Sequence, residues 1–136
     1  MTSFPSGIVF IYFEHYEESC RMLTERFGLE SRADFGYARM FAGTDSFFIG
    51  AVNMADVEKS PQKEKAATLC LTLRDLPALD AYHAFVSAAG GCPSPVEQSP
   101  RLKYKCFTAD GPEGYRFEFG VFTDPAEAAI LMPQGR

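Results

Sequence analysis

The side chain best suited to chemistry or ligand binding in this sequence is Glu118, which lies in the stretch DGPEGYRFEFG at 110–120. A turn-forming segment comes first, and Phe117 and Phe119 then flank the carboxylate in the alternating pattern of a strand. A carboxylate that is buried without a partner costs several kcal/mol. We therefore expect Glu118 to face water, to pair with a cation or to bind a ligand.

Histidine and cysteine, the other residue types with ready chemistry, show no motif spacing. The four cysteines form no C-x-x-C pair, which argues against a zinc or redox motif and predicts buried free thiols. They are Cys20, Cys70, Cys92 and Cys106. The two histidines, His15 and His83, fall at a strand-to-helix junction and inside a helix pattern, where we expect structural or solvent-facing roles. With no nucleophile–base pair, phosphate loop or cofactor motif, the sequence predicts no cofactor.

The charge balance and the hydropathy pattern exclude several classes of partner. Lys and Arg number 13 against 18 Asp and Glu, a net charge of −5, and no basic run occurs, so nucleic acid is not expected. No segment reaches the ~20 apolar residues of a membrane span. The N-terminal apolar run has neither preceding basic residues nor a cleavage site, so a signal peptide is not expected. We expect a cytoplasmic protein.

The first half of the chain predicts one strand, one helix and three further strands. Residues 7–14 alternate like a strand, and apolar residues at helical spacing follow up to Gly28, which caps the helix. Three strand candidates come next, at 29–35, 37–42 and 46–52.

A polar stretch at 53–66 has the composition of a linker, and the same order of elements then returns. A strand at 66–74 precedes a helix at 75–91 with Asp75 as its N-cap. The remaining strand candidates lie at 93–99 (the weakest), 101–109 and 114–122. The tail carries a helix start, with Thr123 or Asp124 as cap, and an apolar tip that either closes a cleft or packs on a second subunit.

The two halves match each other in sequence, and this repeat predicts the fold class. IVFIYFEHYE at 8–17 matches TLCLTLRDLP at 68–77, and FFIGAV at 47–52 matches FEFGVF at 117–122. A β-α-β-β-β unit that occurs twice predicts an α+β fold, in which two tandem modules form concave mixed sheets around a cleft. A ferredoxin-like β-α-β-β-α-β fold, the alternative, has no place for the third strand after each helix. The expected organisation is one domain, 1–136, with module one at 7–52, a linker at 53–66, module two at 67–122 and a tail at 123–136.

RFGLE at 26–30 and DGPEGYRFEF at 110–119 make the chain resemble the glyoxalase, bleomycin-resistance and extradiol-dioxygenase superfamily, the vicinal-oxygen-chelate proteins. The resemblance implies paired modules, frequent dimers and a small-molecule site between the sheets. In metal-using members four cleft positions carry His, Gln or Glu, and the repeat places these positions at Ile8, Phe48, Thr68 and Glu118. Only Glu118 has a ligand side chain. A catalytic metal is therefore disfavoured, because tight binding usually needs three or four protein ligands.

Strand alternation assigns Glu118 to the cleft face of its strand, because Phe117 and Phe119 should pack on the second helix. The cleft faces mix aromatic, hydroxyl and thiol side chains, which is typical of a ligand pocket. The predicted ligand-binding residues are Phe10, Tyr12, Phe48, Thr68, Cys70, Tyr104 and Glu118. Glu118 is then an acceptor for a cationic or hydroxylated ligand, or a catalytic base. The alternatives are an ion pair that merely ties strands together, with Arg116, Arg39, Lys103 or Lys105 as its partner, and a relic of a lost metal site.

Three functions stay open at this point. The leading one is a metal-independent, homodimeric binding protein that resembles bleomycin-resistance proteins and sequesters an aromatic or cationic compound in the inter-sheet cleft. The second is a glyoxalase-like lyase, isomerase or dioxygenase that uses Glu118 as base or metal ligand. The third is a non-catalytic interaction module whose cleft is filled by its own side chains.

Overall fold

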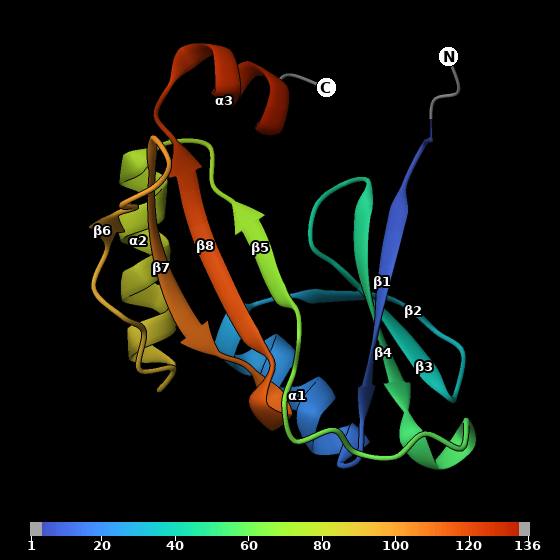
Figure 1. Ribbon diagram of the computed structural model, residues 1–136. Helices are drawn as coiled ribbons and strands as arrows, with labels where there is room; N and C mark the ends of the chain where they lie inside the picture. The colour runs from blue at the N-terminus through green and yellow to red at the C-terminus, as the bar shows by residue number, and fades with distance from the viewer. Residues whose placement is uncertain (1–3, 134–136) are drawn as a thin grey trace. The chain divides into compact units, whose positions relative to one another are not determined.

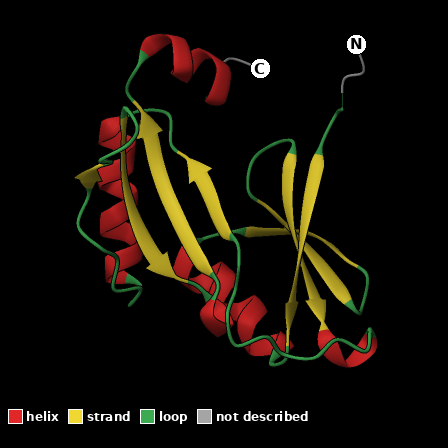
Figure 2. Ribbon diagram, viewed as in Figure 1, coloured by secondary structure: helices red, strands yellow, loops and turns green. Residues whose placement is uncertain are grey.

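A computed structural model describes residues 4–133, which fall into two compact units. The first unit ends at Glu64 and the second begins at Lys65. Figure 1 labels the elements of each unit, and Figure 2 separates their strands from their helices. No helix among these residues combines the length and the apolarity needed to cross a membrane.

The first unit is a four-stranded mixed sheet with one α-helix. Its elements are β1 (Gly7–Phe13), α1 (Tyr16–Phe27), β2 (Glu30–Asp34), β3 (Ala38–Ala42), β4 (Phe47–Asn53) and the short 3-10 helix η1 (Met54–Asp56). The strand order is β1-β4-β3-β2, with β1 parallel to β4 and the other pairs antiparallel. The first strand of the unit therefore pairs with its last.

The second unit repeats this topology. Its elements are β5 (Thr68–Thr72), α2 (Leu76–Ala88), β6 (Glu97–Gln98), β7 (Tyr104–Asp110), the 3-10 turn η2 (Pro112–Gly114), β8 (Arg116–Phe122) and α3 (Pro125–Leu131). The strand order is β5-β8-β7-β6, again with the first and last strands parallel.

The α+β class and the twofold β-α-β-β-β order are confirmed. The ferredoxin-like alternative is wrong, because three strands rather than two follow each of α1 and α2. The strand expected at 93–99 is reduced to the two residues of β6. Pro93, Pro95 and Pro100 border it, and a proline has no backbone N–H to give to a sheet.

Helix α1 forms where its sequence supplies both ends and an apolar stripe. Glu17 and Glu18 in the first turn interact favourably with the helix dipole, and Gly28 closes the last turn in the left-handed conformation at φ 69°. Leu23 and Phe27 are buried in the core of the first unit.

Helix α2 is capped at its N-terminus by Asp75, whose carboxylate accepts the N–H of Ala78 at 2.9 Å. The ring of Tyr82 lies 4.8 Å from that of Phe119 on β8, which ties the helix to its sheet. His83 Nε2 lies 2.8 Å from the carbonyl oxygen of Ser94, and the ring meets a phenylalanine edge-on. His83 therefore has the structural role expected from its helix.

The cysteines depart from expectation, because only Cys20 is buried. Cys70 and Cys92 are exposed and Cys106 is intermediate, and all four are free thiols. Cys70 lies on β5, an edge strand of its sheet, and edge positions have a neighbouring strand on one side only.

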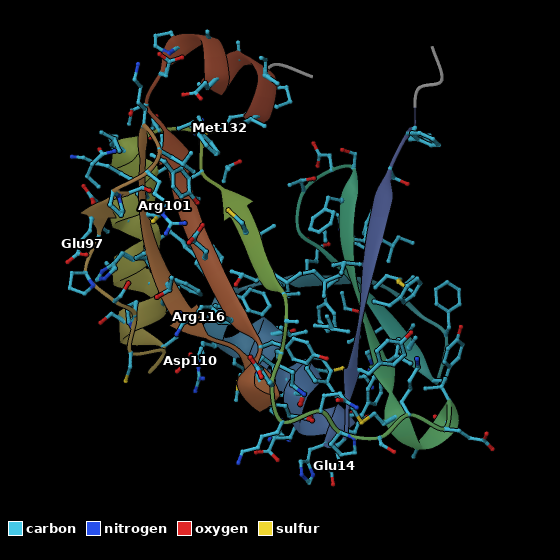
Figure 3. The ribbon with its side chains drawn as sticks, viewed as in Figure 1. Glu14, Glu97, Arg101, Asp110, Arg116 and Met132 are labelled. Carbon is cyan, nitrogen blue, oxygen red and sulfur yellow. The ribbon has the colours of Figure 1, made fainter. Side chains whose placement is uncertain are left out.

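Helix α3 has the predicted start: Asp124 accepts the N–H of Glu127 at 3.1 Å. The side chain of Met132 reaches back to β8, where its sulfur accepts the N–H of Phe122 at 3.3 Å (Figure 3). Ile130 and Leu131 remain largely exposed.

Candidate functional site

The predicted carboxylate lies on the face of the second sheet that is turned away from α2. On β8, Phe117 and Phe119 are buried, whereas Glu118 between them is half-buried on the opposite face. Strand register places Cys70 of β5 on one side of Glu118 and Thr108 of β7 on the other. Alternation therefore assigned the faces of β8 correctly.

Three side chains on this face form a hydrogen-bonded chain, called here the Cys70–Tyr104–Glu118 chain. The hydroxyl of Tyr104 donates to Glu118 Oε2 at 3.2 Å, and Cys70 Sγ lies 3.0 Å from the same hydroxyl oxygen. The hydroxyl gives its proton to the carboxylate, and the Cys70 sulfur lies within hydrogen-bonding distance of the same oxygen. Three predicted residues thus meet, while Thr68 lies two residues before Cys70 and opposite Arg116.

The surroundings of the Cys70–Tyr104–Glu118 chain keep the Tyr104 hydroxyl and the Cys70 thiol protonated. Burial raises the pKa of Tyr104, and the adjacent Cys70 and Glu118 raise it further. Cys70 is exposed as a residue, but partial burial of its thiol raises the pKa of that thiol; the Tyr104 hydrogen bond opposes that shift and the Glu118 carboxylate adds to it. Burial and the nearby Glu118 likewise raise the pKa of Cys106. The face therefore offers hydrogen-bond donors around a carboxylate, not a thiolate nucleophile.

A glycine fixes the position of the Tyr104 ring. Tyr104 is only 3% exposed, and its ring packs on that of Phe122 with centroids 4.5 Å apart. A Cβ atom at Gly120 would collide with Cε1, Cζ and Oη of Tyr104, so the absent side chain is what lets the ring lie across β8. Packing thus places the hydroxyl against Glu118.

Glu118 forms no ion pair with any residue in the described range 4–133. Two of the expected partners are engaged elsewhere, Lys103 with Asp124 at 3.6 Å and Arg39 with Glu17 at 3.0 Å. Arg116 lies on the same face of β8, exposed and in register with Asp110 (Figure 3). The expected ion pair of Glu118 is therefore not present among residues 4–133, and the hydrogen bond from Tyr104 links β8 to β7 instead.

The first unit has an aromatic and apolar surface on the face of its sheet turned away from α1, called here the aromatic face. Its members are Ile8, Phe10, Tyr12, Met40 and Phe48. Phe10 is 46% exposed, and its ring lies over Gly50, where a Cβ would come within 2.6 Å of Cδ1. The ammonium of Lys59 lies 5.0 Å from the centroid of Tyr12, a cation–π contact. The aromatic face can therefore accept a cation.

Arg39, one of the expected ion-pair partners of Glu118, instead contacts residues of the first unit. Its guanidinium makes two hydrogen bonds with Glu17, at 3.0 and 3.1 Å, and a third with Asp34 at 3.3 Å. It also stacks over the ring of Tyr16, 5.3 Å from the centroid. These contacts leave no role for Arg39 as a free cation.

The positions that the resemblance assigns to metal ligands do not fit a metal site. Register pairs Ile8 with Phe48 and Cys70 with Glu118, so the residue equivalent to Ile8 is Cys70 and not Thr68. Cys70 keeps its proton, and both it and Glu118 bind the Tyr104 hydroxyl. Among residues 4–133 no three His, Cys, Asp or Glu side chains gather in a way that could hold a metal ion.

The second unit also contains a groove that sequence reasoning missed. Its volume is about 900 Å³, and it runs between α3, the end of β8 and the start of α2. Its lining includes the apolar residues Leu76, Phe122 and Met132 and the charged residues Arg74 and Asp75. The Asp124 cap signalled α3 itself, but no sequence pattern indicates which surface a short terminal helix covers.

Solved structures share this fold. A glyoxalase/bleomycin resistance protein/dioxygenase from Nocardioides superposes with a TM-score of 0.70 at 16% identity, over 92% of this chain and 88% of its own. Lactoylglutathione lyase from Agrobacterium tumefaciens gives 0.65 at 13% identity, over 83% and 90% of the two chains. The fosfomycin resistance protein FosX from Mesorhizobium loti gives 0.64 at 16% identity, over 93% and 98%. No family model matches the sequence, and no curated protein matches it significantly.

Proposed function

For a chain that has the fold of the glyoxalase, bleomycin-resistance and dioxygenase proteins, we propose a role as a small-molecule-binding protein that sequesters a cationic or aromatic compound without a metal ion. The fold hosts many chemistries, so the proposal is argued from the side chains.

The observation that carries the proposal is the state of Glu118. It is a half-buried carboxylate whose Oε2 accepts the Tyr104 hydroxyl, and it has no cationic partner among the described residues. Removing a charge from water without pairing it is unfavourable. A ligand that brings a positive charge to Glu118 relieves this penalty, which makes the carboxylate an anchor for cationic compounds.

The aromatic face of the first unit supports the same ligand class. Phe10 and Ile8 are 46% and 48% exposed, which is high for apolar side chains on a sheet. The contact between Lys59 and the Tyr12 ring is a cation–π pair inside the protein itself. The net charge of −5 adds a mild attraction for cations.

The proposal is tested by titrating cationic aromatic compounds into the protein and comparing Glu118→Gln with a matched control. Asp80→Asn is the control, because it removes the same charge from an exposed position on α2. Loss of a charge-assisted hydrogen bond is worth about 1.5–3 kcal/mol, so Glu118→Gln should weaken binding about 10- to 100-fold. Equal affinities of the two variants would contradict the assignment of Glu118 as the anchor.

Metal content separates this proposal from a glyoxalase-like enzyme. The purified protein is analysed by elemental mass spectrometry before and after incubation with nickel, zinc, manganese and iron(II). We expect no stoichiometric metal, because Ile8, Phe48 and the Tyr104-bound pair Cys70 and Glu118 do not supply three ligands. A tightly held metal that Glu118→Gln releases would refute the metal-independent proposal and favour the enzyme.

We extend the proposal to a homodimer, for which α3 offers a contact surface. Ile130 is 76% exposed and Leu131 51% exposed, on a helix with no buried residue. Sedimentation equilibrium of the wild type and of Ile130→Glu tests this. A wild-type dimer that the substitution dissociates is expected, and a monomeric wild type would contradict the extension.

A further inference from the structure

We propose that the ligand group bound by Glu118 is an ammonium that carries at least one N–H, from a primary, secondary or tertiary amine, and that quaternary ammonium compounds are discriminated against. This inference rests on the proposed function and deepens it. The geometry around the carboxylate provides the argument, in three steps.

The first step concerns which of the two Glu118 carboxylate oxygens is already hydrogen-bonded. Oε2 accepts the Tyr104 hydroxyl at 3.2 Å, and the Cys70 thiol also interacts with the carboxylate. An ionised carboxylate has about four acceptor sites, so Tyr104 fixes Oε2 while acceptor capacity remains for a ligand, chiefly on Oε1. An oxygen with open lone pairs gains most from a donor N–H that points at it, whereas a quaternary ammonium has no such proton.

The second step is the rigidity with which Tyr104 fixes Oε2. The Tyr104 ring is held between Gly120 and Phe122, and its hydroxyl oxygen also lies 3.0 Å from the Cys70 sulfur. Tyr104 is thus a positioning residue that aims the carboxylate. A charge-assisted hydrogen bond is strongest when its acceptor is already oriented, because no side-chain freedom is lost on binding.

The third step is what surrounds Glu118 on its own sheet. Its neighbours across the strands are Cys70 and Thr108, and Cys106 lies two residues before Thr108 on the same face of β7. Both faces of the Tyr104 ring are covered, since this residue is 3% exposed. Quaternary ammonium groups are recognised by open aromatic faces, and the described residues of this sheet present none beside Glu118.

The test compares two probes that differ by one methyl group, N,N-dimethylbenzylamine and benzyltrimethylammonium, by NMR titration of the full chain at neutral pH. Amide signals of β5, β7 and β8 report binding. We expect the tertiary amine to bind about ten-fold more tightly than the quaternary ion, as one charge-assisted hydrogen bond predicts. In Glu118→Gln this ratio should fall to about one, whereas Asp80→Asn should keep it.

Tyr104→Phe is the second variant, because it keeps the ring over Gly120 and removes only the hydroxyl. We expect the probe ratio to fall several-fold, and Tyr82→Phe, on the helix side of the sheet, to leave it unchanged. A ratio of affinities is not moved by a loss of folded protein, so a merely structural role would not produce this result.

Two outcomes would overturn the inference, and they are distinguishable. If both probes bind equally and both are weakened by Glu118→Gln, the cation anchor stands and the N–H requirement falls. If neither probe shifts the amides of β5, β7 and β8 at millimolar concentration, the inference and the anchor role of Glu118 both fall.

Discussion

Replacing Gly120 by alanine should be far more damaging than the same change at Gly50, although the two glycines occupy equivalent places in the two units. Each lies in the last strand of its unit, beneath an aromatic ring. At Gly50 the ring belongs to Phe10, which is 46% exposed and can swing into water. At Gly120 it belongs to Tyr104, which is 3% exposed and hydrogen-bonded at its tip.

The magnitudes follow from these two environments. Overpacking a fixed neighbour costs about 1–3 kcal/mol, and loss of the Tyr104–Glu118 hydrogen bond costs about 1 kcal/mol more. Alanine lowers the conformational entropy of the unfolded chain, which stabilises the protein by about 0.4–1 kcal/mol at either position, since neither glycine has a left-handed conformation. We therefore expect Gly120→Ala to lower the free energy of unfolding by about 2–3 kcal/mol and Gly50→Ala to change it by about 0.5 kcal/mol or less.

Urea denaturation followed by circular dichroism measures the two variants, because the chain has no tryptophan to report by fluorescence. The double variant with Tyr104→Ala removes the obstructing ring, so Gly120→Ala should cost little in that background. Equal losses for Gly50→Ala and Gly120→Ala, or an unchanged loss in the Tyr104→Ala background, would refute the reasoning.

Three further predictions concern titration and cation binding. The pKa of the Cys70 thiol is raised from 9.0, so its contribution to stability is present below that pH and is lost as pH rises. Cys70 and Cys92 are both exposed residues, but the raised pKa should make iodoacetamide modify Cys70 more slowly than Cys92 in peptide mass spectrometry, and equal rates would contradict this. The pKa of Asp34 is lowered from 3.8, chiefly by the hydrogen bond from the N–H of Gly36. The ionised Asp34 therefore stabilises the fold above pH 3.8, and this stabilisation is lost as pH falls. Urea midpoints measured at pH values on either side of 3.8 should show a loss of stability in acid that Asp34→Asn reduces. Identical pH profiles of the variant and the wild type would argue against this role of Asp34. Lys59→Gln removes the ammonium that lies over the Tyr12 ring and should raise the affinity of benzyltrimethylammonium for the aromatic face about two- to five-fold by NMR titration, whereas lower affinity would show that the lysine does not compete.

Much of the fold could be read from the sequence because strands and helices impose fixed periods on the side chains. The buried Phe117 and Phe119 around the half-buried Glu118 follow directly from the period of two in a strand. The Asp75 cap and the Gly28 terminus were visible for the same kind of local reason.

The parts of the site that sequence missed depend on long-range packing. Alternation fixes the face of a residue but not the register of a parallel pair, since a shift of two residues keeps the same face. The repeat therefore pointed to Thr68, while the strands pair Glu118 with Cys70. Likewise, no local pattern tells that the Tyr104 hydroxyl leans across Gly120 to reach Glu118.

The pairing of first and last strands within each unit has a consequence for the order in which the protein folds. Gly7 pairs with Phe47, 40 residues later, and Thr68 with Arg116, 48 residues later. The entropy of closing these loops differs by only about 0.2 kcal/mol, because it grows with the logarithm of length. Intrinsic closure rates are therefore similar, and the direction of synthesis decides the sequence of events. The first sheet has all its strands once Asn53 has left the ribosome, and it can close while the second unit is still being made.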